Sequence, residues 1–261
     1  MENYQQMNSI TSSKKKNNIK IWAVIIWLGV WQLLSMYVNS AILIASPVET
    51  VKCLLGLLGV ASFWQSIFFT LIRICVGLLI ANILGIILAA FAYMSKPFQD
   101  FVSIPVAVTK ATPVASFIIL ALIWIPSKNL SVFISFLMSF PVIFTNILQG
   151  LNSMDKKMLD MAKVFKLSTP RKLRFIYAPQ VIPYYRAAAS LSNGLCFKAG
   201  IAAEVIGQPN GSIGERLYEA KIYFNTPELF AWTITIIIVS IVFNRFFMLL
   251  INLAMNKLEG Q

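Results

Sequence analysis

Long apolar stretches separated by short polar connections constrain this chain more than any other feature of its sequence. Hydrophobic residues make up 58% of the 261 residues and charged residues only 12%. The mean hydropathy is +0.74, which excludes an ordinary soluble domain. A bilayer-spanning helix needs roughly 20 residues. The sequence therefore predicts an all-α membrane protein with six transmembrane helices, at about residues 21–38, 67–94, 101–125, 130–151, 181–206 and 230–255.

Several predicted segments carry residues that modify a plain helix. In the second span, small residues four apart form a seam that another helix can approach closely, although small residues are common in membrane helices in any case. This seam consists of Gly77, Ala81, Gly85 and Ala89. The third span is interrupted by Pro105 and by residues 110–113, which leave backbone groups unpaired. Residues 46–49 predict a capping box that opens an amphipathic helix near 47–59, outside the membrane core.

A basic island lies between the fourth and fifth spans. Its seven basic residues are Lys156, Lys157, Lys163, Lys166, Arg171, Lys172 and Arg174. A loop this basic stays on the cytoplasmic side. Apolar residues at helical spacing predict a helix over about 155–166, and residues 168–170 predict a cap and a first-turn proline for a second one. Because a soluble loop needs no apolar stripe, we expect this loop to press against a partner. The alternative is a solvated loop held inside by its charge alone.

Lysine and arginine residues are distributed unevenly between the two sides of the predicted bundle. With the amino terminus inside, thirteen lie on the cytoplasmic side and four lie outside. This asymmetry predicts a multi-pass plasma-membrane protein with both termini in the cytoplasm. The chain then divides into a cytoplasmic tail at 1–20, a transmembrane domain at 21–255 that contains the loop at 152–179, and a cytoplasmic tail at 256–261. The same topology explains the net charge of +12, so we expect the lipid bilayer and no nucleic acid as a partner.

The basic island resembles the cytoplasmic EAA loop of ABC-importer permeases. The pattern of that loop is Glu-Ala-Ala, three residues, Gly, nine residues, Ile, one residue and Leu-Pro. At those spacings this chain has Asp160-Met161-Ala162, Lys166, Ile176 and Ala178-Pro179. The spacing is intact, whereas Asp replaces Glu, Met replaces the first Ala, Lys replaces Gly and Ala replaces Leu.

Further stretches in order along residues 40–255 resemble the nitrate/sulfonate/taurine group of these permeases. They are Ile44–Pro47, the small-residue seam, Lys110–Pro113 with Leu122–Trp124, Ala203–Gly207, and Gly211–Gly214 with Glu219-Ala220. The resemblance implies the permease subunit of an ATP-driven importer for a small polar or anionic solute, such as nitrate, a sulfonate, taurine or a thiamine precursor. It also implies two copies of an ABC ATPase, an extracytoplasmic solute-binding protein and a second permease copy. The two permease copies would form a homodimer around the translocation path.

Residues that could carry out catalysis do not form a recognisable set in this sequence. There is no phosphate-binding loop of the G-x-x-x-x-G-K type and no histidine. The three cysteines are scattered without metal-ligand spacing, at Cys53, Cys75 and Cys196. We therefore expect a non-catalytic subunit without a metal or cofactor of its own. ATP and Mg would belong to the partner ATPase.

Two groups of residues are candidates for function. The apolar stripe and the resemblance give the ATPase-coupling loop, with Met158, Asp160, Ala162, Phe165, Lys166 and Pro179. A charge at mid-bilayer costs roughly 2.5–3.5 kcal/mol, so Lys110, Lys198 and Glu204 are candidates for the translocation pathway. Snorkelling or pairing between helices is the alternative for these three residues. Lys198 and Glu204 are six positions apart and so lie on different helix faces. Arg73 and Arg186, near span ends, are expected to snorkel.

Two other functions are compatible with the same segments. A secondary transporter would need no ATPase, although the internal repeats common in such proteins are not evident. The membrane coupling subunit of a vitamin-type importer would contact ATPases without passing substrate. An intramembrane enzyme is disfavoured by the missing catalytic groups.

Overall fold

The computed structural model describes residues 21–40 and 42–259, and within them all regular structure is helical. The predicted tail 1–20 lies outside the described residues, as do residues 260–261 of the second tail. The helices are α2 (Ile21–Val38), α3 (Pro47–Leu58), α4 (Ala61–Met94), α5 (Lys96–Ala111), α6 (Val114–Ala121), α7 (Ser127–Asn152), α8 (Lys156–Val164), α9 (Thr169–Lys172), η1 (Leu173–Tyr177), α10 (Ala178–Gly207), α11 (Ile213–Ile222) and α12 (Thr226–Glu259).

Within the described residues, four helices are long and apolar enough to cross a bilayer, namely α2, α4, α7 and α12. The pair α5 and α6 gives a fifth candidate span if it is counted as one broken element. The predicted fifth span forms α10, a continuous helix of 30 residues, but its tyrosine, serine, asparagine and charged residues make it more polar than the others. The all-helical membrane architecture is confirmed, and the count of six spans stays a prediction.

The third predicted span is not a single helix. Its residues form α5 and α6, which are bent by 106° at the break. The cause is Pro113, because a proline forces the residue before it into an extended conformation. Thr112 accordingly has φ −87° and ψ 134°. Pro105, by contrast, stays inside α5, as Pro141 stays inside α7.

Helices α4, α7 and α10 pack together and form the core. The predicted small-residue seam of α4 is buried along its whole length. A Cβ atom at Gly77 would lie 2.4 Å from the backbone oxygen of Val132, and one at Gly85 would lie 2.8 Å from the side chain of Ile143. The seam is therefore confirmed as the surface on which α7 approaches α4.

The capping box before α3 is also confirmed. The Ser46 hydroxyl accepts a hydrogen bond from the Glu49 N–H at 3.2 Å, and the Glu49 carboxylate accepts one from the Ser46 N–H at 3.0 Å. The bond from the Ser46 backbone, followed by that from its hydroxyl, holds the pKa of Glu49 below its usual value. Proline in the first turn completes the start of the helix.

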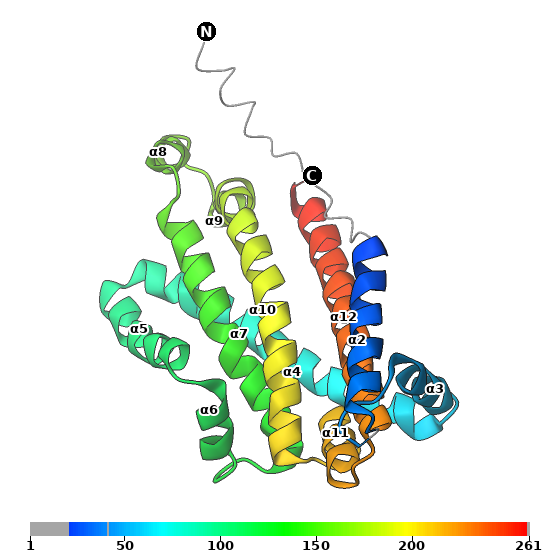
Figure 1. Cartoon of the computed structure of the whole chain (residues 1–261). Helices are drawn as coiled ribbons and strands as arrows, with labels where there is room; N and C mark the ends of the chain where they lie inside the picture. The colour runs from blue at the N-terminus through cyan, green and yellow to red at the C-terminus, as the bar shows by residue number, and fades with distance from the viewer. Residues whose placement is uncertain (1–20, 41, 260–261) are drawn as a thin grey trace.

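The short helices lie at the two ends of the bundle. Figure 1 shows α8 and α9 at one end, together with the start of α2 and the end of α12. Helices α3, α6 and α11 lie toward the opposite end. The loop that contains the basic island is thus separated by the length of the core helices from the segment between α10 and α12, which contains α11.

Candidate functional site

Helix α8 is formed by the amino-terminal half of the basic island, as its apolar spacing predicts. The carboxylate of Asp155 caps the helix by accepting a hydrogen bond from the N–H of Lys157 at 2.9 Å. At the other end Lys166 has φ 48° and lies in the left-handed region. The N–H of Leu167 then donates to the carbonyl of Ala162 at 3.0 Å, which is the bond of a Schellman motif.

The residues of α8 differ widely in burial. Ala162 is fully buried within the chain, and it is the only buried residue of the helix. Four apolar side chains are exposed: Met158 (45%), Met161 (47%), Val164 (76%) and Phe165 (71%). Asp160 is also exposed, and it forms an ion pair with Lys163 at 3.0 Å. Ala162 therefore packs α8 against its own chain, while Met158 and Phe165, one turn away on the same side of the helix, remain exposed.

The base of the loop is held by Gln180, which sequence reasoning did not single out. Its side-chain oxygen accepts a hydrogen bond from the N–H of Asp155 at 3.0 Å, and its nitrogen lies 3.7 Å from the sulfur of Met158. Pro179 stands beside it in the first turn of α10. Helix α9, the five-residue π-helix η1 and α10 follow one another without a break, so a displacement of α8 would be felt at the start of α10.

The two candidate lysines of the membrane domain are both exposed. Lys110, at the end of α5, donates to the hydroxyl of Thr145 on α7 at 3.3 Å. Lys198 lies on the face of α10 that also exposes Leu191 and Leu195. In the described part of the chain, neither lysine forms an ion pair with an acidic residue.

Glu204, the third candidate, lies in the interior. Its side chain is fully buried, and one carboxylate oxygen accepts a hydrogen bond from the hydroxyl of Thr70 on α4 at 2.7 Å. The same hydroxyl accepts a hydrogen bond from the N–H of Ile213 at 3.0 Å. A Cβ atom at Gly214 would lie only 2.4 Å from the Cβ atom of Glu204. Thr70 and Glu204 thus join α4, α10 and α11, on a different face of α10 from Lys198.

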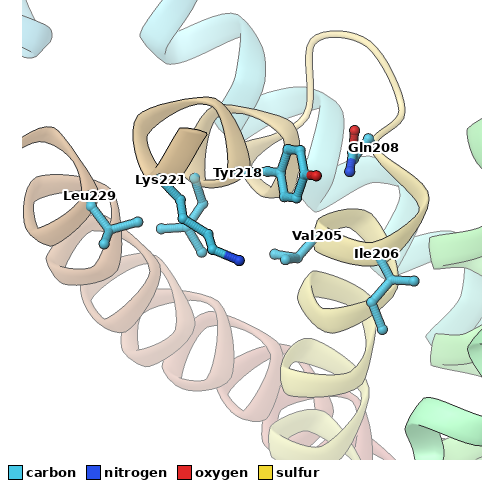
Figure 2. A pocket seen from close by; sticks show the side chains of 7 residues that line it. Val205, Ile206, Gln208, Tyr218, Lys221 and Leu229 are labelled. Carbon is cyan, nitrogen blue, oxygen red and sulfur yellow. The ribbon is translucent and has the colours of Figure 1, made fainter. Parts of the chain in front are cut away.

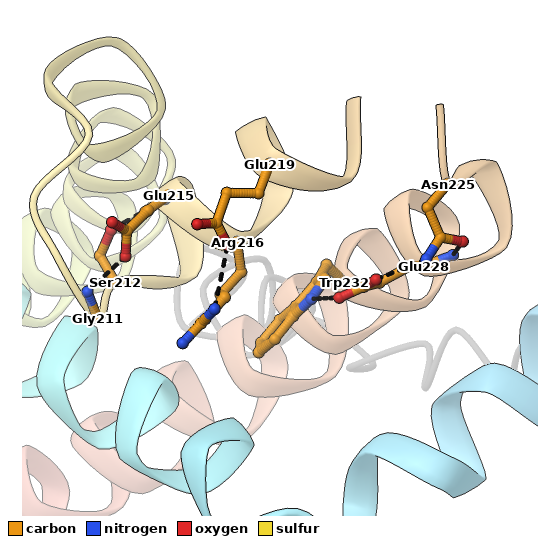
Figure 3. A network of polar contacts seen from close by, with 8 residues as sticks. All are labelled: Gly211, Ser212, Glu215, Arg216, Glu219, Asn225, Glu228 and Trp232. Atoms are coloured by element: carbon orange, nitrogen blue, oxygen red, sulfur yellow. Dashed lines mark hydrogen bonds and ion pairs between the residues drawn. The ribbon is translucent and has the colours of Figure 1, made fainter. Parts of the chain in front are cut away.

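Helix α11 is fixed by local polar contacts, which Figure 3 shows. The Ser212 hydroxyl caps it by accepting from the N–H of Glu215 at 3.0 Å, and the Glu215 carboxylate in turn accepts from the N–H of Gly211. Arg216 and Glu219 form an ion pair at 3.1 Å. The start of α12 is held similarly, because Glu228 accepts hydrogen bonds from the side chains of Asn225 and Trp232.

A pocket of about 430 Å³ lies between α11, the end of α10 and the start of α12. Figure 2 shows Tyr218 and Lys221 of α11 beside this pocket, opposite Val205 of α10. Most of the residues that line the pocket are apolar, including Leu217 and Leu229. It contains no acidic residue among its lining side chains in the described part of the chain.

The prediction that Arg73 snorkels is wrong. Its side chain is 7% exposed, and its guanidinium carbon lies 3.7 Å from the centroid of the Phe69 ring. The cause is tertiary, because Arg73 lies one turn after Thr70 on the face of α4 that turns toward α10. Sequence position alone placed it near the membrane surface.

A bundle of long apolar helices with a capped, basic loop at one end defines a multi-pass membrane protein. Residues 81–259 match the family of binding-protein-dependent transport system inner membrane components, and the chain belongs to this family.

Three named relatives resemble the chain over most of its length. A putative aliphatic sulfonates transport permease protein of Bacillus subtilis is 23% identical over 85% of this chain and 81% of its own. A putative ABC transporter permease protein of Methanocaldococcus jannaschii is 23% identical over 94% of both chains. A nitrate import permease protein of Synechococcus elongatus is 25% identical over 75% of this chain and 73% of its own.

The family assignment confirms the interpretation drawn from the EAA-like spacing and the ordered motifs. It favours an importer permease over a secondary transporter or an intramembrane enzyme, since the family consists of membrane subunits of binding-protein-dependent systems.

Proposed function

We propose that this chain is the membrane-spanning subunit of an ATP-driven importer in the plasma membrane, with both termini in the cytoplasm. A solute-binding protein would deliver the solute on the outer side, and two ATPase subunits would bind on the cytoplasmic side. Family membership supports the importer class. The excess of Lys/Arg residues on one side supports the orientation.

The apolar face of α8 carries the coupling part of this proposal. Met158, Met161, Val164 and Phe165 are exposed together on a helix that is capped at both ends. Contiguous apolar side chains on a well-formed exposed helix mark an interaction surface. Docking of this face in a groove of the ATPase would bury it, and the continuous segment from α9 to α10 would carry ATPase motion into the membrane domain. Asp160, Lys166 and Pro179 would set the helix and its connection rather than contribute apolar area.

The transported solute is, on this proposal, a small anion. The relatives named for aliphatic sulfonates and nitrate support that class. Lys110 and Lys198 support it too, because cations on the helices of a membrane domain normally face a water-filled path or a partner. We place these two lysines on the translocation pathway between two copies of the chain. Glu204 belongs to the same proposal as a residue that holds the outer part of the pathway through Thr70.

Replacing Phe165 with serine tests the coupling role. Loss of a central aromatic side chain costs an interface about 2 kcal/mol or more, so Phe165→Ser should lower the amount of ATPase that copurifies with the permease and should lower transport. The measurement is copurification of the partner ATPase from membranes, with transport assayed in proteoliposomes that also contain the binding protein.

Tyr223→Ser is the matched control. Tyr223 is 77% exposed and follows α11 as Phe165 follows α8, but it lies at the opposite end of the bundle. It should leave ATPase copurification unchanged. Normal ATPase binding by Phe165→Ser, with α8 still formed, would refute the coupling role of this face.

A further inference from the structure

A second cavity lies at the end of the bundle opposite α8. Its volume is about 440 Å³. It is formed where the start of α4, the start of α7 and the segment after α10 meet, and it is lined by Phe69, Arg73, Ser127, Lys128, Gln208, Pro209 and Asn210. Two cationic side chains and three neutral polar ones therefore surround a single space, and no lining residue is acidic in the described part of the chain.

Arg73 is the unusual member of this lining. Arg73 is only 7% exposed, and both terminal guanidinium nitrogens lack a hydrogen-bond partner among the described residues. A buried donor without a partner is costly, and more so when it is charged. The contact with Phe69 covers one face of the guanidinium but satisfies none of its N–H donors. The fork of donors on Arg73 matches the oxygen atoms of an oxyanion.

The start of α7 adds a second favourable feature. Pro126 occupies the N-cap position and makes no side-chain cap hydrogen bond. The first backbone N–H groups of this 26-residue helix, at Ser127 and Lys128, thus lack a side-chain acceptor at the edge of the cavity. A helix amino terminus with free N–H groups favours an anion. Lys128 is exposed and adds a mobile positive charge.

We propose that this cavity binds one small oxyanion, of the nitrate or alkylsulfonate kind, between Arg73 and the amino terminus of α7. Gln208 and Asn210 supply neutral donors at the edge of the same cavity. The claim that the imported anion binds here before it reaches Lys198 and Lys110 rests on the proposed function. The claim that the cavity binds an anion rests on Arg73, Lys128 and the helix terminus alone.

Glu204 offers Arg73 another possible partner. One of its carboxylate oxygens is buried without a hydrogen-bond partner, and α10 carries it one turn before Gln208. The two side chains interact electrostatically, while the other oxygen of the Glu204 carboxylate accepts the hydrogen bond from Thr70. If Arg73 served only as the counter-ion of Glu204, loss of either charge would destabilise the protein and leave anion binding without a specific site.

The test is titration of the purified permease–ATPase complex with methanesulfonate and with nitrate, followed by calorimetry, against sodium chloride at the same ionic strength. Arg73→Gln should weaken binding roughly ten- to a hundredfold, the usual effect of losing hydrogen bonds to a charged group. Lys128→Gln changes an exposed residue and leaves folding intact, and it should weaken binding several-fold. Arg245→Gln, an exposed arginine on α12 outside the cavity, is the matched control and should bind as the parent does.

Wild-type binding of both anions by Arg73→Gln and Lys128→Gln would overturn the proposal. So would equal loss of thermal stability in Arg73→Gln and Glu204→Gln with no anion-dependent difference, since that result identifies a structural ion pair. If the parent complex binds no small oxyanion while Arg73→Gln loses the binding protein, the cavity accepts a carboxylate of that partner and the proposal also fails.

Transport assays separate this inference from the proposed function. Import of sulfonate at the parental rate by an Arg73→Gln complex that has lost anion binding would refute the place of this site on the import path and leave both the site and the importer function standing. Anion binding that depends on Arg73 in a complex that imports neither sulfonate nor nitrate would do the reverse.

Discussion

Helices α8 and α11 are built alike at opposite ends of the molecule, yet their surroundings differ. Each begins after a residue whose side chain accepts a hydrogen bond from a first-turn N–H, Asp155 for α8 and Ser212 for α11. Each ends at a residue in the left-handed region, Lys166 with φ 48° and Phe224 with φ 54°. The same local signals therefore specify both helices.

A buried alanine closes both motifs. The carbonyl of Ala162 accepts from the N–H of Leu167 at 3.0 Å, and the carbonyl of Ala220 accepts from the N–H of Asn225 at 2.9 Å. Ala162 is fully buried and Ala220 is 3% exposed. Each helix thus uses one small side chain to lie close to the rest of its chain.

Burial of the remaining residues separates the two helices. Helix α11 also buries Ile213 and Gly214 against the core, whereas α8 buries no second residue and leaves Met158 and Phe165 in solvent. Helix α11 is therefore held by the core over its first turns, although residues 222–224 at its end are exposed. The smaller burial of α8 within its own chain leaves more of it for a partner, and the proposed coupling role would assign that part to the ATPase.

The largest loss of stability should come from Gly214→Ala, which disturbs the packing of α11 against α10. The added Cβ atom would lie 2.4 Å from the Cβ atom of Glu204 and 2.5 Å from the backbone nitrogen of Val205. Backbone atoms cannot move aside cheaply, so we expect a loss of about 1–3 kcal/mol or more. Thermal unfolding of the detergent-solubilised protein measures this loss.

Gly194→Ala provides the control for that experiment. A Cβ atom at this position on α10 meets nothing within 4 Å, and alanine favours a helix over glycine. Its stability should equal or exceed that of the parent. If Gly214→Ala were as stable as Gly194→Ala, α11 would not be seated as described, and its contrast with α8 would disappear.

A loss of similar size is expected from Thr70→Val, which keeps the shape of the side chain. The change removes the donor to Glu204 and the acceptor for the N–H of Ile213. Each buried group left unpaired costs about 1–3 kcal/mol. Thr235→Val is the control, because the hydroxyl of Thr235 is also buried but bonds only to Ala231 in its own helix. Equal thermal stability of the two variants would contradict the bridging role of Thr70.

Sequence reasoning succeeded where the signal is local. The long helices follow from apolar runs, the capping box before α3 follows from Ser46 and Glu49, and the α4 seam follows from the spacing of its small residues. Helix α8 likewise follows from its apolar stripe. Each of these features depends on neighbours within a few turns, which the sequence displays directly.

The remaining features depend on contacts between distant segments. Thr70 and Glu204 are 134 positions apart, and Asp155 and Gln180 are 25 apart. No pattern in a single sequence links such pairs. For the same reason Arg73 was expected at the membrane surface, and Ala162 was expected to be a partner contact although it lies inside its own chain. The bend at Pro113 was signalled, but its angle depends on how α6 packs on α7 and α10.

The smallest predicted effect concerns the end of α8, where the lysine takes the place of the glycine in the EAA pattern. Lys166 adopts φ 48°, a conformation that costs a residue with a Cβ atom about 1–2 kcal/mol. Glycine avoids this cost but loses more conformational freedom on folding, by about 0.5–1 kcal/mol. Lys166→Gly should therefore stabilise the end of α8 by a few tenths to about 1 kcal/mol, measured as slower amide hydrogen exchange at Phe165 and Leu167.

Lys166→Ala separates the backbone effect from the change in charge. It removes the same positive charge but keeps the Cβ atom, so it should leave amide exchange in α8 unchanged or faster. The comparison with α11 sharpens the point, since Phe224 occupies the equivalent position in a helix that the core already holds. Phe224→Gly should slow exchange in α11 less than Lys166→Gly slows it in α8. Equal exchange rates in Lys166→Gly and Lys166→Ala would mean that packing, and not the left-handed residue, limits the stability of α8.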